Sequence, residues 1–327
     1  MSRSNNNLKA VLQDTADAIR AKTGSTSPIV PRDFADEIGA IQTGGGSSIV
    51  PGPNDNVIVY DYDGTILDAK QVAVGAEYTL PEGPTHDGLT FDGWSCSTAS
   101  VNGKITIPAS KQVRVGALYH TTSGKLEMDV YVPKNIEIRF QRQANSGFSV
   151  VDWGDGTIDN DSNTYYSHTY AIEGNYTIKI TMASNEFKSA DAWQGSLQYP
   201  IFKSIRLPNT ITILNASFAN LNALVSVTIP SSVTTAINAV FSYCSSLKAI
   251  IYPKVNPNGT IANSAISNTD AKIVVIPDGI SELSPYAFNG SKQIEELVLP
   301  NTITSFRNYC IQTCQSLVKI VYLRIQP

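Results

Sequence analysis

Four aspartates are concentrated in one short stretch, where their carboxylates could bind a cation. They are Asp152, Asp155, Asp159 and Asp161. Carboxylate oxygens are ligands that Ca²⁺ prefers, but the spacing is not that of a helix–loop–helix calcium site. Aspartate is also a favoured turn residue, because its side chain accepts hydrogen bonds from nearby backbone amides. We therefore expect turn-forming aspartates and no metal, with calcium binding by this loop left open.

The four cysteines are a second set of candidate ligands: Cys96, Cys244, Cys310 and Cys314. Cys310 and Cys314 are four residues apart, but no second pair and no nearby histidine completes a zinc site. Buried free thiols are the better interpretation. We expect no metal and no cofactor.

Two further aspartates, Asp61 and Asp63, follow a short apolar strand. The stretch from Val57 to Asp68 resembles the first motif of haloacid-dehalogenase-type phosphatases, and Gly154–Asp159 is similar to their late acidic motif. The resemblance implies Asp61 as nucleophile and Asp63 as general acid beside Mg²⁺. That fold needs a parallel sheet with crossover helices, whereas residues 68–155 alternate as strands between Pro, Gly, Ser and Thr. The sequence therefore predicts a protein that is not an enzyme.

The composition limits the fold and the partners. Of the 327 residues, 42% are hydrophobic and 16% are charged, with a net charge of −4, which indicates a folded chain of two to four domains. Basic residues form no run, which argues against nucleic-acid binding, and no apolar stretch is long enough for membrane insertion. Strand-like alternation from Val57 to Tyr119 and from Lys125 to Met182 predicts a mainly β, multidomain chain.

The first forty residues have helical periodicity instead. Apolar residues repeat at helical spacing before Gly24 and again after Pro31. Two short amphipathic helices cannot bury a core alone, so they are expected to attach to copies of themselves or to another protein. The attachment residues are Leu8, Val11, Leu12, Ile19, Phe34, Ile38 and Ile41. The glycine-rich linker that follows places the first domain boundary at residue 46.

Two stretches resemble known β modules. Within residues 47–122, Tyr60–Thr65 and Gly88–Trp94 resemble the Listeria–Bacteroides repeat, a small β-grasp-like module of surface proteins. The resemblance implies a hairpin turn at Asp63-Gly64 and a core position for Trp94. Within residues 123–184, Val151–Thr157 and Ser167–Tyr170 look like a PKD domain, an immunoglobulin-like β-sandwich. His168 is then a structural residue.

A sequence repeat occupies residues 185–327. Prolines at 208, 230, 253, 277 and 300 recur at intervals of 22, 23, 24 and 23 residues, each after a short strand. Phe218, Phe241 and Phe288 each lie twelve residues before their proline, and a leucine or isoleucine follows six residues later. A fixed period of about 23 residues with one strand per unit predicts a solenoid whose units bury their apolar residues against each other.

The repeat resembles the BspA-type leucine-rich repeat, as in Phe241–Pro253, and such repeats are typically adhesive. Cys244 and Cys314 fall in the same slot, where that family often has a buried cysteine. They are three repeats apart, which corresponds to roughly 14 Å if repeats are spaced like neighbouring strands. A disulfide needs Cα atoms within about 7 Å, so these two cysteines should not be bonded.

One residue in each repeat strand is expected to face outward, two positions before the proline, since its neighbours on both sides face the core. This outward column comprises Arg206, Thr228, Ile251, Val275, Val298 and Val321. It becomes apolar towards the C-terminus, which fits either plain strand propensity or a contact face for a partner. The last repeat is followed by no polar capping repeat, which favours association at that end.

The N-terminal forty residues resemble a segment of tail and baseplate proteins from phages and prophages of Gram-positive bacteria. Met1–Asn7 lacks the apolar core of a secretion signal. We therefore expect a tail-fibre or baseplate protein that is made in the host cytoplasm and resides in the virion. Its helices would attach to other virion proteins, with homo-oligomerisation possible, and its repeats would bind a bacterial surface glycan or protein. The alternatives are a capsid- or tail-decorating fibre without receptor binding and, third, a haloacid-dehalogenase-like phosphatase.

Overall fold

The computed structural model describes residues 49–109, 112–141, 148–160, 165–188, 202–253 and 259–322. The chain divides after Ser48, close to the boundary expected from the glycine-rich linker, and the second part begins at Ile49. The described residues form strands and turns, and none of them is helical. The mainly β prediction is confirmed for this part, while the expected N-terminal helices lie outside it. Among the described residues there is no helix long and apolar enough to cross a membrane.

The first β module contains two small sheets. The larger sheet has the order β2-β1-β7-β4, in which β1 and β7 are parallel and the other neighbours are antiparallel. Its strands are β1 (Val57–Tyr60), β2 (Ile66–Lys70), β4 (Leu89–Cys96) and β7 (Val113–Thr121). The smaller sheet, β3-β6-β5, is made of β3 (Glu77–Thr79), β5 (Ser100–Val101) and β6 (Lys104–Thr106). Apolar side chains of both sheets, including Val59, Tyr78 and Ile105, form its core.

The second β module continues into the repeats. Its strands are β8 (Leu126–Val132), β9 (Glu137–Gln141), β10 (Phe148–Asp152), β11 (Ile158–Asp159), β12 (Tyr165–Thr169) and β13 (Gly174–Met182). One sheet has the order β11-β10-β13-β8-β15-β17, so β8 pairs on one side with β13 and on the other with β15, the first strand of the repeats. The antiparallel pairing expected here is confirmed for β8 and β13. The same sheet continues with β15 and β17, which come after the domain boundary expected at residue 184.

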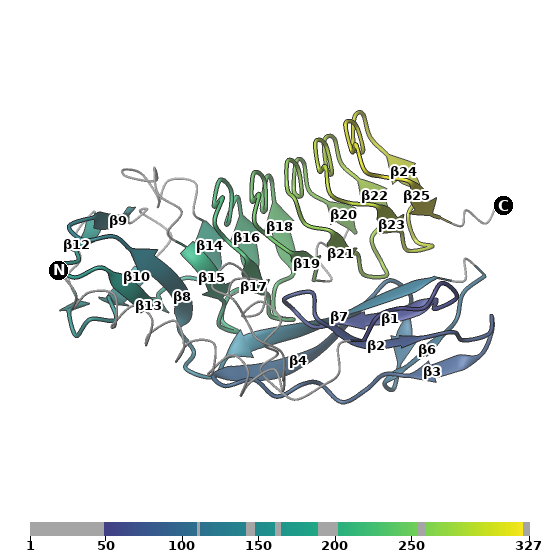
Figure 1. Ribbon diagram of the computed structural model, residues 1–327, viewed down its shortest axis with the longest axis horizontal. Helices are drawn as coiled ribbons and strands as arrows, with labels where there is room; N and C mark the ends of the chain where they lie inside the picture. The colour runs from purple at the N-terminus through teal and green to yellow at the C-terminus, as the bar shows by residue number, and fades with distance from the viewer. Residues whose placement is uncertain are drawn as a thin grey trace, which may run out of the picture. The chain divides into compact units, whose positions relative to one another are not determined.

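The repeats stack as a solenoid with two rows of short parallel strands, seen in succession from β15 to β25 in Figure 1. The first row is β15 (Phe202–Arg206), β17 (Ser226–Thr228), β19 (Ala249–Ile251), β21 (Ile273–Val275), β23 (Glu296–Val298) and β25 (Lys319–Val321). The second row is β14 (Glu186–Lys188), β16 (Ile213–Asn215), β18 (Thr235–Ile237), β20 (Thr260–Ile261), β22 (Glu282–Leu283) and β24 (Ser305–Phe306). We number the rungs 1 to 6 by the strands of the first row.

One hydrophobic core fills both the second β module and the solenoid. It runs from Leu126 through Trp153 and Phe218 to Cys310. In rungs 1 to 5 the core takes the residues one and three before the proline, such as Ile250 and Tyr252, as the repeat pattern predicts. In rung 6 the equivalent Ile320 is 41% exposed. The solenoid is therefore held at its first rung by a sheet and a core that it shares with the preceding module.

Candidate functional site

Some internal contacts recur between rungs. Phe218 and Phe241 occupy the same slot in successive rungs, and their rings stack with centroids 5.2 Å apart. The thiol Sγ of Cys244 lies 2.9 Å from the carbonyl oxygen of Phe218, and that of Cys314 lies 3.1 Å from the carbonyl oxygen of Phe288. The shared slot of the two cysteines is thus confirmed. All four cysteines are free, and burial raises the pKa of Cys244 to about 12, so its thiol is protonated and unreactive at neutral pH.

The outward column faces away from the solenoid core but is not open to solvent. Ile251 and Val275 belong to a separate hydrophobic cluster with Ile58, Tyr60 and Leu118 of the first β module. Their exposed fractions are 4% and 0%; Thr228, Val298 and Val321 are also buried, and Arg206 is partly buried. Ile251 and Val275 point away from the solenoid core, as strand alternation predicts. Side chains of the first β module cover Ile251 and Val275, so this part of the column is buried within the chain rather than an exposed contact face.

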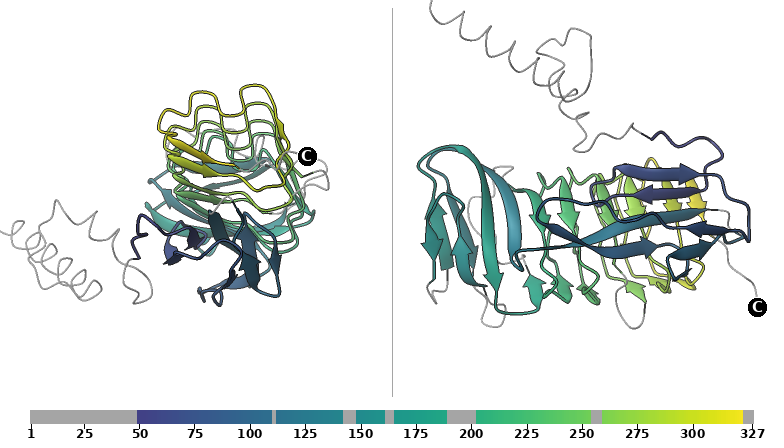
Figure 2. Two further views of the ribbon diagram at one scale, coloured as in Figure 1. Left: turned by 90° about the vertical axis from the view of Figure 1, so that its right-hand side faces the viewer. Right: turned by 90° about the horizontal axis from the view of Figure 1, so that it is seen from below.

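The cover is the pair of strands β4 and β7, which run across the rungs of the first row; Figure 2 shows this crossing. The Thr121 amide donates a hydrogen bond to the Leu207 carbonyl in rung 1, at 3.0 Å. Ser95 Oγ donates to the Tyr252 carbonyl in rung 3, at 2.7 Å. Arg114 reaches Glu296 in rung 5, with 2.8 Å between Nη2 and Oε2. The strands therefore span five rungs, which is compatible with about 3.3 Å per residue along β7 and about 4.8 Å per rung.

A glycine permits the closest approach of the cover to the rungs. A Cβ atom added at Gly116 of β7 would lie 2.5 Å from Cδ1 and 2.6 Å from Cγ2 of Ile251. Such distances are well inside van der Waals contact, so only glycine fits there without displacement of Ile251. The Ile251 side chain packs onto the bare backbone of β7 at this point.

The turns that follow the second row form an edge of the solenoid with exposed aromatic rings. Tyr286 in rung 4 is 41% exposed and Tyr309 in rung 5 is 54% exposed. Their rings stack with centroids 5.4 Å apart and an interplanar angle of 22°. The sequence analysis missed this pair, although its signal was available. Tyr286 lies two residues before Phe288, and Tyr309 lies two residues before Ile311, which is the residue equivalent to Phe288 in the next rung.

A family model described as the BspA type leucine rich repeat region matches residues 195–318 in six copies. Residues 195–318 are BspA-type repeats. A comparison with curated proteins finds no match. The predicted family of the repeats is thus confirmed, whereas the β-grasp-like and PKD-like assignments of the two preceding modules stay predictions.

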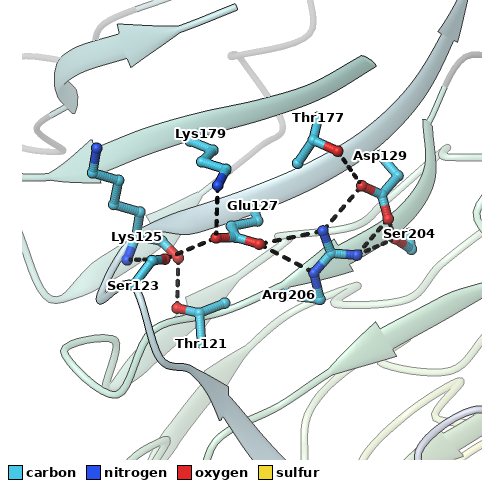
Figure 3. Close-up of polar contacts among 9 residues, drawn as sticks. All are labelled: Thr121, Ser123, Lys125, Glu127, Asp129, Thr177, Lys179, Ser204 and Arg206. Atoms are coloured by element: carbon cyan, nitrogen blue, oxygen red, sulfur yellow. Dashed lines mark hydrogen bonds and ion pairs between the residues drawn. The ribbon is translucent and has the colours of Figure 1, made fainter. Parts of the chain in front are cut away.

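Arg206, the first member of the outward column, joins the BspA-type repeats to the second β module (Figure 3). Its guanidinium contacts Asp129 through both terminal nitrogens and Glu127 through Nη2 at 3.3 Å. Ser204 and Thr177 also donate to Asp129, at 2.5 and 2.8 Å. Burial by itself would raise the pKa of Asp129, but the hydrogen bonds from Arg206 and Ser204 outweigh it and lower that pKa. These contacts fasten β15 to β8.

Asp61 directly follows β1 and is buried within the first β module. Its Oδ2 lies 2.8 Å from His86 Nε2, and its Oδ1 accepts from the Tyr62 amide at 2.8 Å. Burial raises the pKa of Asp61, and the Tyr62 amide and His86 offset part of the effect. Asp63 accepts from the Thr65 amide at 2.9 Å within the β1–β2 turn. Both carboxylates are thus engaged in holding a hairpin, as the Asp63-Gly64 turn prediction implied.

The aspartates near residue 155 also stabilise turns. Asp152 accepts from the Gly154 amide and Asp155 from the Thr157 amide, each at 3.0 Å. The second carboxylate oxygen of Asp155 lies 2.7 Å from His168 Nε2, and the His168 ring stacks on Trp153. These contacts agree with turn-forming aspartates and a structural His168. Within the described residues, no group of three potential ligands is arranged to hold a metal ion; Asp161 lies outside them.

A shallow pocket of about 200 Å³ opens where the cover meets rungs 4 and 5. Tyr60, Arg114, Lys272 and Glu296 are among its lining residues. Glu296 is engaged on both sides, by Arg114 and by Lys319 Nζ at 2.7 Å. Two charged residues of the pocket lining, Arg114 and Glu296, thus join the first β module to the solenoid. The predicted attachment residues, Leu8, Val11, Leu12, Ile19, Phe34, Ile38 and Ile41, all lie outside the described residues.

Proposed function

We propose that this chain is a non-enzymatic binding protein of a phage virion, in a tail fibre or baseplate, that presents its BspA-type repeats to the bacterial surface. The observation that carries the proposal is the six-copy repeat match over a stacked solenoid. Repeat arrays of this kind offer an extended, regular surface, and they bind through it. The repeats support an adhesion or binding role, and the virion setting is proposed from the N-terminal segment.

The virion setting is supported by the N-terminal segment. Residues 8–41 resemble a segment of phage tail and baseplate proteins, and the chain divides directly after the glycine-rich linker. The first part would attach to other virion proteins, and Ile49–Pro327 would extend towards the cell. A capsid- or tail-decorating fibre would have the same division but no receptor.

The absence of catalysis is part of the proposal and is supported by the environment of Asp61. A nucleophilic aspartate must reach its substrate, yet Asp61 is 4% exposed and hydrogen bonded to His86 and to the Tyr62 amide. An Mg²⁺-dependent phosphatase activity that disappears in Asp61→Asn would overturn this part.

The test compares the full chain with residues 49–327 in a binding assay on whole Gram-positive cells. We expect both to bind the same strains saturably, because the repeats and their cover are intact in each. Only the full chain should be incorporated into particles when it is supplied during phage assembly. Incorporation without saturable cell binding on any strain would favour the decorating fibre and contradict the proposal. The repeats alone are a poor substitute, since removal of β7 would expose Ile251 and Val275.

A further inference from the structure

The turn edge of rungs 4 and 5 carries exposed rings that the solenoid does not need. The position two residues before the phenylalanine position of the repeat is occupied by Ala216, Ala239 and Ser264 in rungs 1 to 3. Tyr286 and Tyr309 occupy it in rungs 4 and 5. All five backbones are left-handed, with φ of 46°, 40°, 54°, 59° and 61°. A small residue therefore satisfies this turn. A bulky side chain in this conformation is disfavoured, so neither the turn nor the core accounts for the two tyrosines.

The surface around the two rings is polar but uncharged. Residues 286–290 and 308–313 include no charged side chain. Asn289 Nδ2 donates to Gln312 Oε1 at 3.3 Å, so one amide pair links the same two rungs as the ring pair. Gln312 is exposed and Asn289 is half-buried. Arg307, the adjacent cation, is paired with Glu282 at 2.7 Å. The edge thus combines aromatic faces with amides that both donate and accept hydrogen bonds.

Tyr286 is stacked against Tyr309 and is 41% exposed. The equivalent residue in the preceding rung is Ser264, whose side chain has no ring to cover Tyr286. A further ring could therefore lie over Ser264 and continue the stack against Tyr286. Residues 286–290 and 308–313 offer stacking and neutral hydrogen bonds, and these two segments carry no charge for an anion or a charged peptide.

We propose that Tyr286 and Tyr309, with Asn289 and Gln312, form a contact site for a neutral glycan. The apolar face of a pyranose ring would pack on a tyrosine ring, and its hydroxyl groups would pair with the amides. The site rests on the proposed binding function and specifies its surface and its ligand class. It also places ligand contact on the turns that follow the second row of strands, because β7 covers the outward side of the first row.

The experiment uses the full chain and the double variant Tyr286→Ala, Tyr309→Ala. Alanine already occupies this slot at Ala216 and Ala239, so the variant should fold, which a thermal unfolding curve checks. Tyr243→Ala is the matched control: Tyr243 is also 54% exposed with φ of 61°, but it lies in another turn position, two residues after Phe241. Binding is measured on whole cells of a strain that the wild-type chain binds, untreated, protease-treated or treated with periodate, which cleaves vicinal diols of sugars.

We expect wild-type binding to survive the protease and to be lost after periodate. The double variant should bind at least tenfold more weakly, and Tyr243→Ala within about twofold of wild type. Unchanged binding by the double variant, or binding abolished by the protease alone, overturns the glycan site while the proposed function stands. If the wild-type chain binds no strain, the proposed function fails. Calorimetric titration with neutral cell-wall oligosaccharides then tests the site by itself. The glycan site is overturned if no heat of binding is measured, or if the heat is unchanged in Tyr309→Ala.

Discussion

The strand face and the turn edge of the solenoid repeat with the same period but meet different surroundings. The outward column on the first-row strands is buried from Thr228 to Val321, and β7 of the same chain contacts β17, β19 and β21 on this face. On the turn edge, Tyr286 and Tyr309 remain open to solvent. An apolar column on a repeat protein thus indicates that something covers it, but the covering element can be an earlier part of the chain. Exposed rings at positions that the fold could fill with alanine are the better indication of an external ligand.

Introduction of a charge on each surface gives the largest contrast. Ile251→Asp should lower the free energy of unfolding by about 3–5 kcal/mol, because its carboxylate would be buried among apolar side chains without a partner. Tyr309→Asp should lower it by no more than about 1 kcal/mol, since aspartate tolerates a left-handed backbone and only the exposed stack with Tyr286 is lost. Urea unfolding followed by circular dichroism measures both. Similar small effects at the two positions would contradict the covered strand face.

Gly116→Val tests the close approach of the cover to the rungs. The added side chain would collide with Ile251, so we expect a loss of about 1–3 kcal/mol in the free energy of unfolding. Combination with Ile251→Ala should make the two effects non-additive by about 1 kcal/mol or more. The control is Gly174→Ala, where the added Cβ would have its nearest neighbour at 3.6 Å. Strict additivity of the two substitutions would indicate that β7 does not rest on Ile251.

Arg114→Met tests the far end of the cover. It removes the hydrogen bond to Glu296 in rung 5 while keeping most of the side-chain volume, and we expect a loss of about 1–2 kcal/mol. The double variant with Glu296→Gln should lose less than the sum of the single variants, because neither charge is then left without its partner. An effect that vanishes completely in 1 M NaCl would contradict the partly buried contact and indicate a solvent-screened surface pair.

Thr228→Val should have the smallest effect and the opposite sign. Thr228 Oγ1 is buried and has no hydrogen-bond partner among the described residues. An isosteric methyl group removes the cost of that hydroxyl, so the free energy of unfolding should rise by about 1 kcal/mol. Thr228→Ser, which keeps the hydroxyl and deletes the methyl group, is the control and should destabilise. A clear loss of stability in Thr228→Val would show that the hydroxyl has a partner and that the site is less enclosed than described.

The predictable features of the solenoid are those that arise within one rung or between neighbouring rungs. The proline period, the inward side chains and the shared slot of Cys244 and Cys314 depend on short-range packing, and the sequence repeats them several times. The direction of Ile251 and Val275 followed from strand alternation alone. The occupant of their face did not, because it comes from residues more than a hundred positions earlier. Gly116 gives no periodic signal for this contact, and its role depends on a partner that only the folded chain supplies.

The joint between the second β module and the repeats was also beyond sequence reasoning. Glu127, Asp129 and Arg206 are ordinary alternating strand residues in the sequence, and only the pairing of β8 with β15 brings them together. The tyrosines at 286 and 309 were predictable in principle, because the same slot holds alanine or serine in the earlier rungs. Comparison of equivalent positions for what changes, and not only for what repeats, would have identified them.

The crossing strand β7 has a consequence for how this protein can vary in length. Solenoids ordinarily gain or lose whole units by duplication and deletion, since each unit meets only its neighbours. Here the contacts made by Thr121, Gly116 and Arg114 fall on rungs 1, 3 and 5 and have fixed separations along one extended strand. An inserted unit among these rungs would carry Glu296 away from Arg114 by about the spacing of one strand. The length of β7 therefore fixes the number of rungs between Leu207 and Glu296. Only rungs outside this stretch can be added or removed without the loss of these contacts.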